Sequence, residues 1–431
     1  MLHIDTPELR QLLLNGNFGL EKEGLRVTEG GFLSHTSHPF PDDPYIVRDF
    51  CENQTEINTA VRQGAHAVVE ELQRHTDKIH RTLAGLEPRE YLWLFSNPPH
   101  IRNEADIPVA QFGGAQSGKT IYREYLSRRY GKYKMTLCGI HVNYSFNEEL
   151  LRQDFARSGQ TDYVAYKNDL YLTLAKRAAA YSWILVSVTA ASPLMDGSYV
   201  EKDKLDSDIF QGLASVRCSE LGYWNAFAPV FDYTNLTTYV ESMRDFVRKG
   251  WLQSPTELYY PVRLKPAGLN RLETLEAYGV NHIELRMFDL NPLVPAGVDE
   301  RDVAFAGLLL GWLASTEDQP FTERDQVQAV QNFKNAAHYD LKTVNMVVPD
   351  GEVYSVVDAA RNVIGFMREF YRDFPAEVQE VLDFEEAKFI NAENRYAWKI
   401  RREFEGGFVD RGMELAKKRQ EEALKNLSDH L

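Results

Sequence analysis

Polar and apolar residues alternate along the stretch FGLEKEGLRV, which runs from Phe18 to Val27. Alternation with a period of two predicts a β-strand, on which residues i and i+2 point to the same face. Glu21 and Glu23 therefore share a face and lie roughly 7 Å apart, because a strand rises ~3.3 Å per residue. Two carboxylates placed in this way are typical of a site that holds a cation between them.

Three further segments show the same alternation, over Met135–Phe146, Glu257–Lys265 and Val280–Asp289, and we predict strands there. Their polar rows are His141, Asn143 and Ser145; Tyr259, Pro261, Arg263 and Lys265; and His282, Glu284 and Arg286. Any sheet with one solvated face shows polar alternation, but such faces usually carry Thr, Ser and Gln. Glu, His, Arg and Lys around one concavity would instead bind divalent cations and anionic oxygens, which suits a nucleoside triphosphate with Mg²⁺.

Apolar residues recur at three- and four-residue spacing in several segments that we predict to be helices. These are residues 69–86, Tyr163–Ala191, Asn235–Lys249, Arg301–Ser315 and Ser355–Tyr371, with a charged surface helix over Gly412–Asn426. The strands between them alternate, whereas the strands of a doubly wound parallel sheet run continuously apolar. The pattern therefore favours an α+β fold, in one domain over residues 1–431 that is mainly helical from about residue 315.

The composition is that of an ordinary globular protein, since 44% of the 431 residues are hydrophobic and 26% are charged. The 63 acidic residues outnumber the 48 basic ones, which gives a net charge of −15. This excess repels phosphate backbones and anionic lipid surfaces, so we expect neither nucleic acid nor a membrane as a partner. The longest apolar runs fall short of the ~20 residues that a membrane span needs.

The three cysteines, Cys51, Cys138 and Cys218, are far apart and form no C-x-x-C pair. Their spacing argues against a disulfide framework and against a structural zinc site. The first residues lack the basic and apolar segments of a secretory signal. We therefore expect a reducing, cytoplasmic location. The sequence leaves the oligomeric state open, with a monomer as the working assumption.

A further acidic segment, RDFCENQTEIN, runs from Arg48 to Asn58 and contains Asp49 and Glu56. These two acids are seven residues apart, which gives them opposite parity on a strand and places them two turns apart on a helix. They can therefore converge only across a helical turn or a bulge.

The stretch GGAQSGKT, Gly113–Thr120, satisfies the P-loop pattern G-x-x-x-x-G-K-[ST]. A P-loop needs a buried strand before it and a parallel sheet that carries a second strand ending in Asp. The preceding residues contain Pro108, and no such second strand is evident. We interpret the match as a surface loop leading into a helix over Ile121–Arg129, and a P-loop ATPase remains the rival hypothesis.

Taken in order, these motifs resemble those of the bacterial glutamate–cysteine ligases. The matching stretches are Phe18–Val27, Asp49–Glu56, Tyr122-Arg123, Gly139–Asn143, Ala191–Pro193, Arg217–Tyr223, Glu257–Tyr259, Ile283–Arg286 and Asp289–Pro292. The resemblance covers roughly residues 15–300 and is strongest to the proteobacterial type and to the ligase half of bifunctional glutathione synthetases. It implies a glutamine-synthetase-like fold, with a curved antiparallel sheet that forms a funnel and helices packed outside.

The resemblance also implies an activity. An ATP-dependent carboxylate–amine ligase of this family joins the γ-carboxylate of L-glutamate to the amine of L-cysteine through γ-glutamyl phosphate, the first step of glutathione synthesis. ATP would be the co-substrate and Mg²⁺ the metal, with Mn²⁺ compatible. A bifunctional enzyme would need a further ATP-grasp domain, so we expect the product to be γ-glutamylcysteine.

Residue roles follow from the motif positions. The implied Mg²⁺ ligands are Glu21, Glu23, Asp49, Glu56, His141 and Glu284. Arg286 would stabilise the transferred phosphoryl group with Lys265 nearby, and Arg217 would hold a substrate carboxylate. The implied cysteine pocket consists of Phe50, Tyr122, Tyr223 and Tyr259. By residue type alone, a lone strand histidine is more often structural and a tyrosine more often part of the core.

One departure from the family pattern concerns the acceptor. Members usually continue after the last acid of the second motif with Ile-Thr-Pro, whereas this chain has Ile57-Asn58-Thr59-Ala60. The substituted residues could face the acceptor amine. Two alternatives therefore stay open: a ligase that joins glutamate to a different amine, and a non-catalytic sensor of nucleotide or amino acid. The sensor would be marked by missing acids, and all six implied ligands are present.

Overall fold

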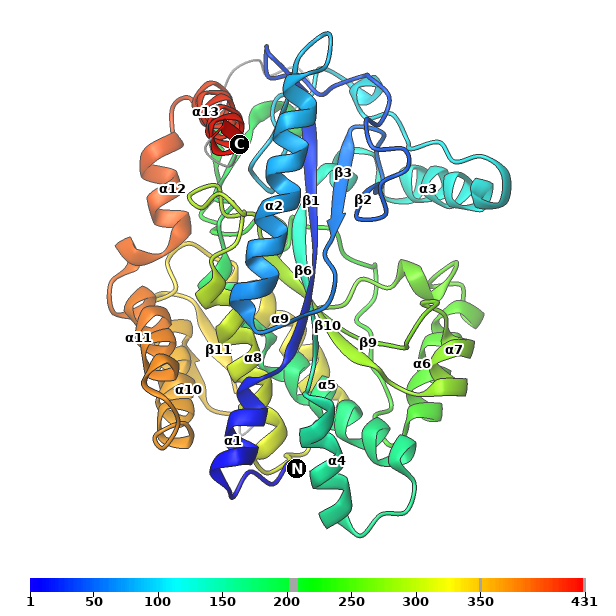
Figure 1. Cartoon of the computed structure of the whole chain (residues 1–431), viewed down its shortest axis with the longest axis vertical. Coiled ribbons are helices and arrows are strands. Elements are labelled where there is room, and N and C mark those ends of the chain that lie inside the picture. The colour runs from blue at the N-terminus through cyan, green and yellow to red at the C-terminus, as the bar shows by residue number, and fades with distance from the viewer. Residues whose placement is uncertain (201–207, 349–350, 429–431) are drawn as a thin grey trace.

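The computed structural model describes residues 1–200, 208–348 and 351–428. Its centre is an antiparallel sheet in which β4 and β5 pair with β1 beside the main path (Figure 1). Along that path the strands are β2 (Ile46–Arg48), β3 (Gln54–Asn58), β1 (Asn17–Thr28), β6 (Gly139–Ser145), β10 (His282–Asp289) and β9 (Val262–Lys265); β4 is Arg62–Gln63 and β5 is Glu90–Leu92. The predicted α+β class with an antiparallel sheet is confirmed.

Three of the four predicted strands are shorter than the sequence indicated, and β10 differs least, since it begins two residues late. Residues Tyr133–Thr136 form a 3-10 turn, and β6 begins only at Gly139. Residues Pro255–Glu257 form another 3-10 turn, and β9 begins at Val262, directly after Pro261. Proline has no backbone N–H to give to the ladder, which explains this later start. Tyr259 and Pro261 therefore lie outside the strand to which we assigned them.

The register of the sheet gathers the polar residues on one face. Residues directly opposite in a ladder point to the same side. The relevant pairs are Glu21 with His141, Glu23 with Glu56, Asn143 with Glu284, Glu284 with Arg263, and His282 with Lys265. We call this side of the sheet the acidic face. The register of β10 against β6 shifts between Leu285 and Phe288, so Arg286 lies at an irregularity.

The opposite face of the sheet is covered by helices. Thr76 of α2 accepts a hydrogen bond from Lys22, and the hydroxyl of Tyr171 in α5 accepts one from the Phe146 backbone. Gly307 of α8 lies against the rings of Phe18 and Tyr144. The helices over this half of the chain are α1 (Pro7–Leu14), α2 (Ala65–Ala84), α3 (Ser117–Tyr130), α4 (Glu148–Ser158), α5 (Tyr163–Thr189), α6 (Leu236–Arg248), α7 (Leu272–Tyr278) and α8 (Glu300–Ser315). The helices α5 and α8, which contain the longest apolar runs, are largely buried.

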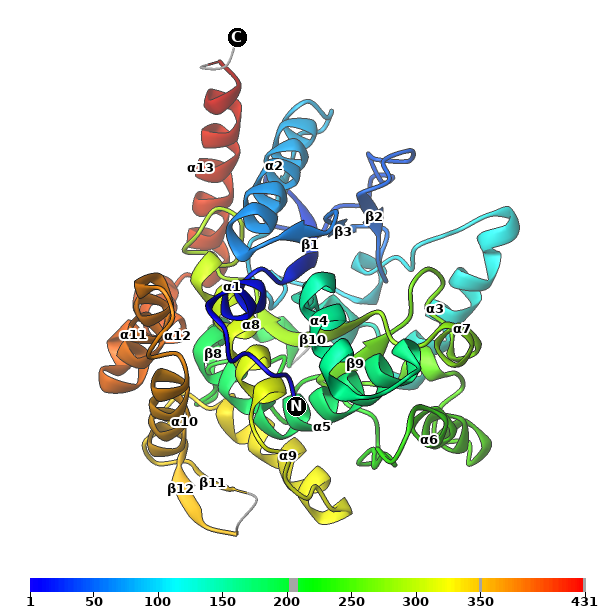
Figure 2. The same ribbon diagram turned by 60° about the horizontal axis from the view of Figure 1, so that its bottom comes forward.

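Beyond α8 the chain continues as helices with one small two-stranded sheet. The elements are α9 (Glu323–Ala336), β11 (Asn345–Val347), β12 (Val353–Ser355), α10 (Val356–Phe370), α11 (Ala376–Ile390), α12 (Tyr396–Phe404) and α13 (Phe408–Ser428). A further short ladder joins β7 (Leu194–Asp196) to β8 (Asp208–Phe210). Helix α13 lies beside α2 in both views (Figures 1 and 2). Among the described residues, no helix has the length and apolarity that crossing a bilayer would require.

The segment that contains Asp49 and Glu56 corrects a prediction. It is a β-hairpin formed by β2 and β3, and not the helical turn or bulge that we expected. Val47 lies opposite Glu56, and Asp49 follows Val47 by two residues, so Asp49 returns to the face of Glu56. Counting the alternation of side chains through the turn gave the wrong result for Asp49 and Glu56. The chain reverses direction between them, so residues of opposite parity come to point to the same face.

The stretch that matches the P-loop pattern does not form a P-loop. Gly114–Gln116 is a 3-10 turn, and α3 begins at Ser117, earlier than predicted. Val109, which precedes this stretch, makes one isolated antiparallel bridge to Cys51. The exposed Lys119 lies over the ring of Phe112, 5.2 Å from its centroid. The interpretation as a surface loop leading into a helix is confirmed.

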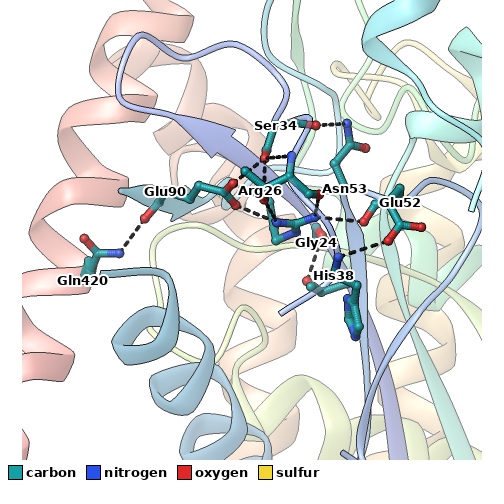
Figure 3. A network of polar contacts seen from close by, with 10 residues as sticks. Gly24, Arg26, Ser34, His38, Glu52, Asn53, Glu90 and Gln420 are labelled. Atoms are coloured by element: carbon teal, nitrogen blue, oxygen red, sulfur yellow. Dashed lines mark hydrogen bonds and ion pairs between the residues drawn. The ribbon is translucent and has the colours of Figure 1, made fainter. Parts of the chain in front are cut away.

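A buried ion pair ties β1 to the elements around it (Figure 3). Arg26 and Glu90 are fully buried, and their guanidinium and carboxylate atoms lie 2.7 Å apart. Arg26 also donates to the carbonyl of Glu52, and Gln420 of α13 donates to the carbonyl of Glu90. The pair therefore connects β1, the β2–β3 hairpin, β5 and the last helix.

We expect Glu90→Gln to lower the free energy of unfolding by about 3–5 kcal/mol, because breaking a buried pair leaves the other charge uncompensated. Guanidinium chloride denaturation measures the change. The matched control is Glu70→Gln, which breaks the exposed pair with Arg74 on α2 and should cost less than about 1 kcal/mol. Equal losses in the two variants would contradict the role assigned to burial.

Candidate active site

Three side chains from neighbouring strands meet at the centre of the acidic face. Glu21 of β1, His141 of β6 and Glu284 of β10 each offer one ligand atom, and these atoms all lie within 4.8 Å of one another. His141 Nδ1 is 3.0 Å from a carboxylate oxygen of Glu21 and 3.8 Å from one of Glu284. The arrangement follows directly from the register, in which Glu21 lies opposite His141 and Glu284 lies opposite Asn143, two residues further along β6.

Two cations hold the Glu284 carboxylate from the other side. Lys265 Nζ is 3.0 Å from Oε1, and Arg286 Nη1 donates to Oε2 at 2.9 Å. Burial opposes ionisation of Glu284, but Arg286 and Lys265 outweigh it and keep its pKa well below the usual range. The buried Oε1 therefore lies between the Lys265 ammonium at 3.0 Å and His141 Nδ1 at 3.8 Å.

A second acidic group lies beside the first on the same face. It consists of Glu23, Asp49 and Glu56. Burial and the charge of Asp49 raise the pKa of Glu23 from its ordinary 4.5 to about 8. Burial and the neighbouring carboxylates also raise the pKa of Glu56 well above its ordinary value. Two buried carboxylates whose ionisation is opposed by their neighbours favour a bound cation.

The donor set fits a divalent cation of the magnesium type. Carboxylate oxygens are the ligands that Mg²⁺ prefers, and an imidazole nitrogen among them is also compatible with Mn²⁺. The convergence of Glu21, His141 and Glu284 and the crowded carboxylates of the second group are the observations that support this fit. The tight group of Glu21, His141 and Glu284 is the most compact ligand set found among the described residues.

Arginine side chains form the boundary between the acids and an aromatic wall. Arg217 Nη2 donates to the carbonyl of Arg286 at 2.6 Å. The Arg217 guanidinium passes so close to Gly139 that a Cβ atom there would lie 2.3 Å from it, which only glycine permits. The backbone N–H of Gly139 donates to Glu23 at 2.8 Å. Because Gly139 has no side chain, β6 can bind Glu23 through its backbone and also leave space for Arg217.

The aromatic wall is built from Tyr223 and Tyr259, whose ring centroids lie 3.7 Å apart at an interplanar angle of 86°. The Arg286 guanidinium lies 5.8 Å from the centre of the Tyr259 ring. These residues and His141 line a cavity of about 30 Å³ together with Arg217, Cys218, Trp224, Tyr260, Pro261 and Phe333. The cavity adjoins the acidic face at His141 and presents cationic and aromatic surface.

Two predicted pocket residues lie apart from this cavity, since neither Phe50 nor Tyr122 is among the residues that line it. Phe50 is buried in the hydrophobic core beside the hairpin turn. Tyr122 lies on α3, where burial raises the pKa of its hydroxyl. The other predicted site residues converge on the acidic face or on the aromatic wall next to it.

Sequence reasoning missed several residues that support the site. Asn143 Nδ2 donates to Glu21 at 3.0 Å, and its place in the same polar row as His141 was the signal. Arg123 Nε donates to the carbonyl of Asp49 at 2.6 Å, and its position beside Tyr122 in a family motif was the signal. For Gly139, no local pattern shows that an arginine from a distant segment passes over it.

The departure at residues 58–60 does not lie in the aromatic cavity. Thr59 exchanges hydrogen bonds with the backbone of Leu20, and the N–H of Ala60 donates to Glu71 of α2. These contacts close the end of the β1–β3 ladder. Asn58 lies opposite Glu21 on the acidic face, and its side chain lowers the pKa of Glu56. The substituted segment therefore completes the acidic face.

The fold and this face define an α+β protein with a group of possible metal ligands beside a cationic and aromatic cavity. The model of the glutamate-cysteine ligase family matches residues 1–251 and 247–336. The chain is 33% identical, over 97% of its length, to the glutathione biosynthesis bifunctional protein GshAB of Listeria monocytogenes, and 31% identical over 92% to that of Clostridium perfringens. The chain belongs to the glutamate–cysteine ligase family.

Two solved structures share the fold. The glutamate–cysteine ligase of Francisella tularensis, solved in complex with AMP, superposes with a TM-score of 0.84 at 23% identity, covering 95% of this chain and 89% of that one. The bifunctional glutathione synthetase of Pasteurella multocida gives 0.82 at 26% identity, covering 96% of this chain and 54% of that one. The chain spans 56% and 51% of the Listeria and Clostridium relatives, about half of their length.

In protein freed of divalent cations with a chelator, we expect stability to fall as pH rises between about 5 and 8. Glu23 and Glu56 bind protons more tightly in the folded chain than in the unfolded one. The free energy of unfolding therefore falls as pH rises through this window. Mg²⁺ should restore Tm, and most strongly at pH 8. Thermal unfolding at pH 5, 6.5 and 8 measures both effects.

The matched variant for this experiment is Glu56→Gln, which removes one charge from the second acidic group and keeps the size of the side chain. It should flatten the loss of Tm with pH in the chelated protein and weaken the response to Mg²⁺. If Tm falls with pH as steeply in Glu56→Gln as in the wild-type protein, the pH dependence does not arise from the second acidic group.

Proposed function

We propose that this chain catalyses ATP-dependent ligation of the γ-carboxylate of L-glutamate to the amine of L-cysteine, with γ-glutamyl phosphate as the intermediate. The observation that carries the proposal is the acidic face, on which Glu21, His141 and Glu284 meet next to Arg286. Membership of the glutamate–cysteine ligase family supports the nucleotide co-substrate and the reaction class. The three cysteines, each buried and free of disulfides in the described chain, support a reducing compartment, the cytoplasm.

The acids would hold Mg²⁺, with Mn²⁺ as an alternative, in two groups: Glu21, His141 and Glu284 in one, and Glu23, Asp49 and Glu56 in the other. When bound, these ions neutralise charge on the phosphate oxygens of ATP. In phosphoryl transfer the protein supplies alignment and electrostatic stabilisation and little covalent chemistry. This agrees with a face built of fixed charges.

The arginines and Lys265 complete the electrostatics of the first step. As the glutamate γ-carboxylate attacks the γ-phosphorus, ADP leaves and an acyl phosphate forms. Arg286, already held by Glu284, would stabilise the charge on the transferred group, with Lys265 as a further cation. Arg217, fixed against the Arg286 carbonyl, would hold a substrate carboxylate.

In the second step the amine of cysteine attacks the acyl carbon, and phosphate leaves. Tyr223 and Tyr259 would form the wall against which the acceptor binds, with Phe50 and Tyr122 shaping the pocket from further out. The wall adjoins Arg286, so acceptor and acyl phosphate would share one boundary. A closed aromatic surface there would exclude water, which would otherwise hydrolyse the acyl phosphate.

The test is an assay of the purified protein with ATP, Mg²⁺, L-glutamate and a panel of amines, with ADP release as the rate and mass spectrometry for the product. We expect γ-glutamylcysteine as the main product, and ADP release that depends on both glutamate and cysteine. A larger kcat/KM with another amine would assign a different acceptor. Nucleotide binding without turnover for any amine would favour the sensor.

We expect Arg286→Met to lower kcat by about 10²–10³-fold, the usual effect of removing a group that stabilises transition-state charge. Lys119→Ala should leave kcat within a factor of two, because Lys119 is exposed on α3 and the P-loop pattern there does not form a P-loop. Steady-state kinetics of both variants test whether Arg286 or Lys119 supports turnover, and Tm checks that the variants fold. Loss of turnover in Lys119→Ala with a normal Arg286→Met would reverse the assignment.

A further inference from the structure

A buried carboxylate, Glu257, lies outside the acidic face, behind the aromatic wall. Its side chain is fully buried. It accepts hydrogen bonds from the hydroxyl of Tyr130 at 2.6 Å, from the hydroxyl of Tyr125 at 3.2 Å and from the backbone of Gln253 at 2.6 Å. Arg129 Nε lies 3.1 Å away and supplies the opposite charge. We call these residues the Glu257 cluster.

The Glu257 cluster touches the aromatic wall by two routes. Asn225 Nδ2 donates to the hydroxyl of Tyr130 and to the carbonyl of Glu257, both at 3.1 Å, and its Oδ1 accepts from the backbone of Tyr259 at 2.6 Å. The Tyr130 ring meets the Tyr223 ring edge to face, with centroids 4.5 Å apart. The position of the Tyr223–Tyr259 pair therefore depends on where Tyr130 and Asn225 are held.

The same cluster fixes helix α3, which extends away from the sheet (Figure 1). Among the described residues, no side chain of α3 is fully buried, so hydrophobic packing holds this helix only weakly. Three of the residues bonded to Glu257 or paired with it, Tyr125, Arg129 and Tyr130, are on α3. Near its middle, α3 carries Tyr122 and the Arg123 that donates to the carbonyl of Asp49.

We propose that Glu257 is a positioning residue for the acceptor amine, an inference that rests on the proposed function. Its carboxylate holds Tyr130 of α3, whose hydroxyl accepts from Asn225, and through these two residues it sets the Tyr223–Tyr259 wall. Arg286 and the proposed metal ligands other than Asp49 lie on β-strands whose register does not involve the cluster. Asp49 contacts α3 through Arg123, which binds its backbone carbonyl. Glu257 therefore acts on acceptor binding more than on the binding of ATP and glutamate.

The test is Glu257→Gln, which keeps the shape of the side chain and removes the charge that pairs with Arg129. We expect KM for cysteine to rise about tenfold, with kcat and the KM values for ATP and glutamate within a factor of two. Tyr130→Phe should give the same selective change, because it removes the hydroxyl shared by Glu257 and Asn225. Tyr125→Phe should have a smaller effect, since that hydroxyl contacts neither Asn225 nor Tyr223 directly.

The matched control is Glu385→Gln. Glu385 is as deeply buried as Glu257 and pairs with Lys388 at 2.7 Å on α11, away from the aromatic wall. This variant should lower Tm and leave all three KM values unchanged. If Glu257→Gln instead raises all three KM values in parallel, or none of them, the positioning role is overturned. If Glu257→Gln does not fold, Tyr130→Phe decides by the same criterion.

Hydrogen–deuterium exchange keeps this inference separable from the proposed function. In Tyr130→Phe and Glu257→Gln, amides of α3 should exchange faster while those of β1, β6 and β10 keep their protection. If the wild-type chain forms no γ-glutamyl product with any amine, the proposed function fails, and the acceptor role fails with it. Unchanged exchange in α3 of an active enzyme overturns the inference alone.

Discussion

The structure depends on a concentration of like charge on one face of a sheet. The antiparallel register places Glu21, Glu23, Glu56 and Glu284 on neighbouring strands pointing the same way, and like charges directly opposite one another destabilise a sheet. The register is kept because a shift of one residue would move every acid into the hydrophobic layer on the other side. The chain must therefore compensate the repulsion between these carboxylates at the acidic face itself.

Compensation is unequal across the face. On the β10 side, Lys265 and Arg286 both contact Glu284, and its pKa lies well below the usual range. On the β3 side, Glu23 and Glu56 lie beside Asp49. Arg217 and Arg286 lower the pKa of Glu23 in part, but the pKa values of both glutamates are raised. The compensation of the acids by protein cations therefore decreases from β10 towards β3. A bound divalent cation would relieve most repulsion near β3. An anionic phosphate group would be stabilised most near Arg286.

The sequence predicted the acidic face because strand parity is a local property. Alternation grouped Glu21 with Glu23 in β1 and Glu284 with Arg286 in β10, and placed His141 in the polar row of β6. The register then brought these rows to one face. Asp49 could not be placed, because its face is set by how the β2–β3 hairpin closes. Contacts between distant segments were also invisible: neither Gly139 beside Arg217 nor Glu257 beside Tyr130 has a signal in the local pattern.

The buried side of β1 explains why its register can withstand the repulsion. Lys22, between Glu21 and Glu23, points into the hydrophobic layer, where its ammonium donates to Thr76 of α2 and to the carbonyl of Ala296. Gly297 leaves the room that this side chain needs, since a Cβ there would lie 3.0 Å from the ammonium. Burial lowers the pKa of Lys22 to about 7. A slipped register would move Lys22 away from both acceptors and bury the neighbouring carboxylates instead, so the two faces of β1 fix the same alignment for independent reasons.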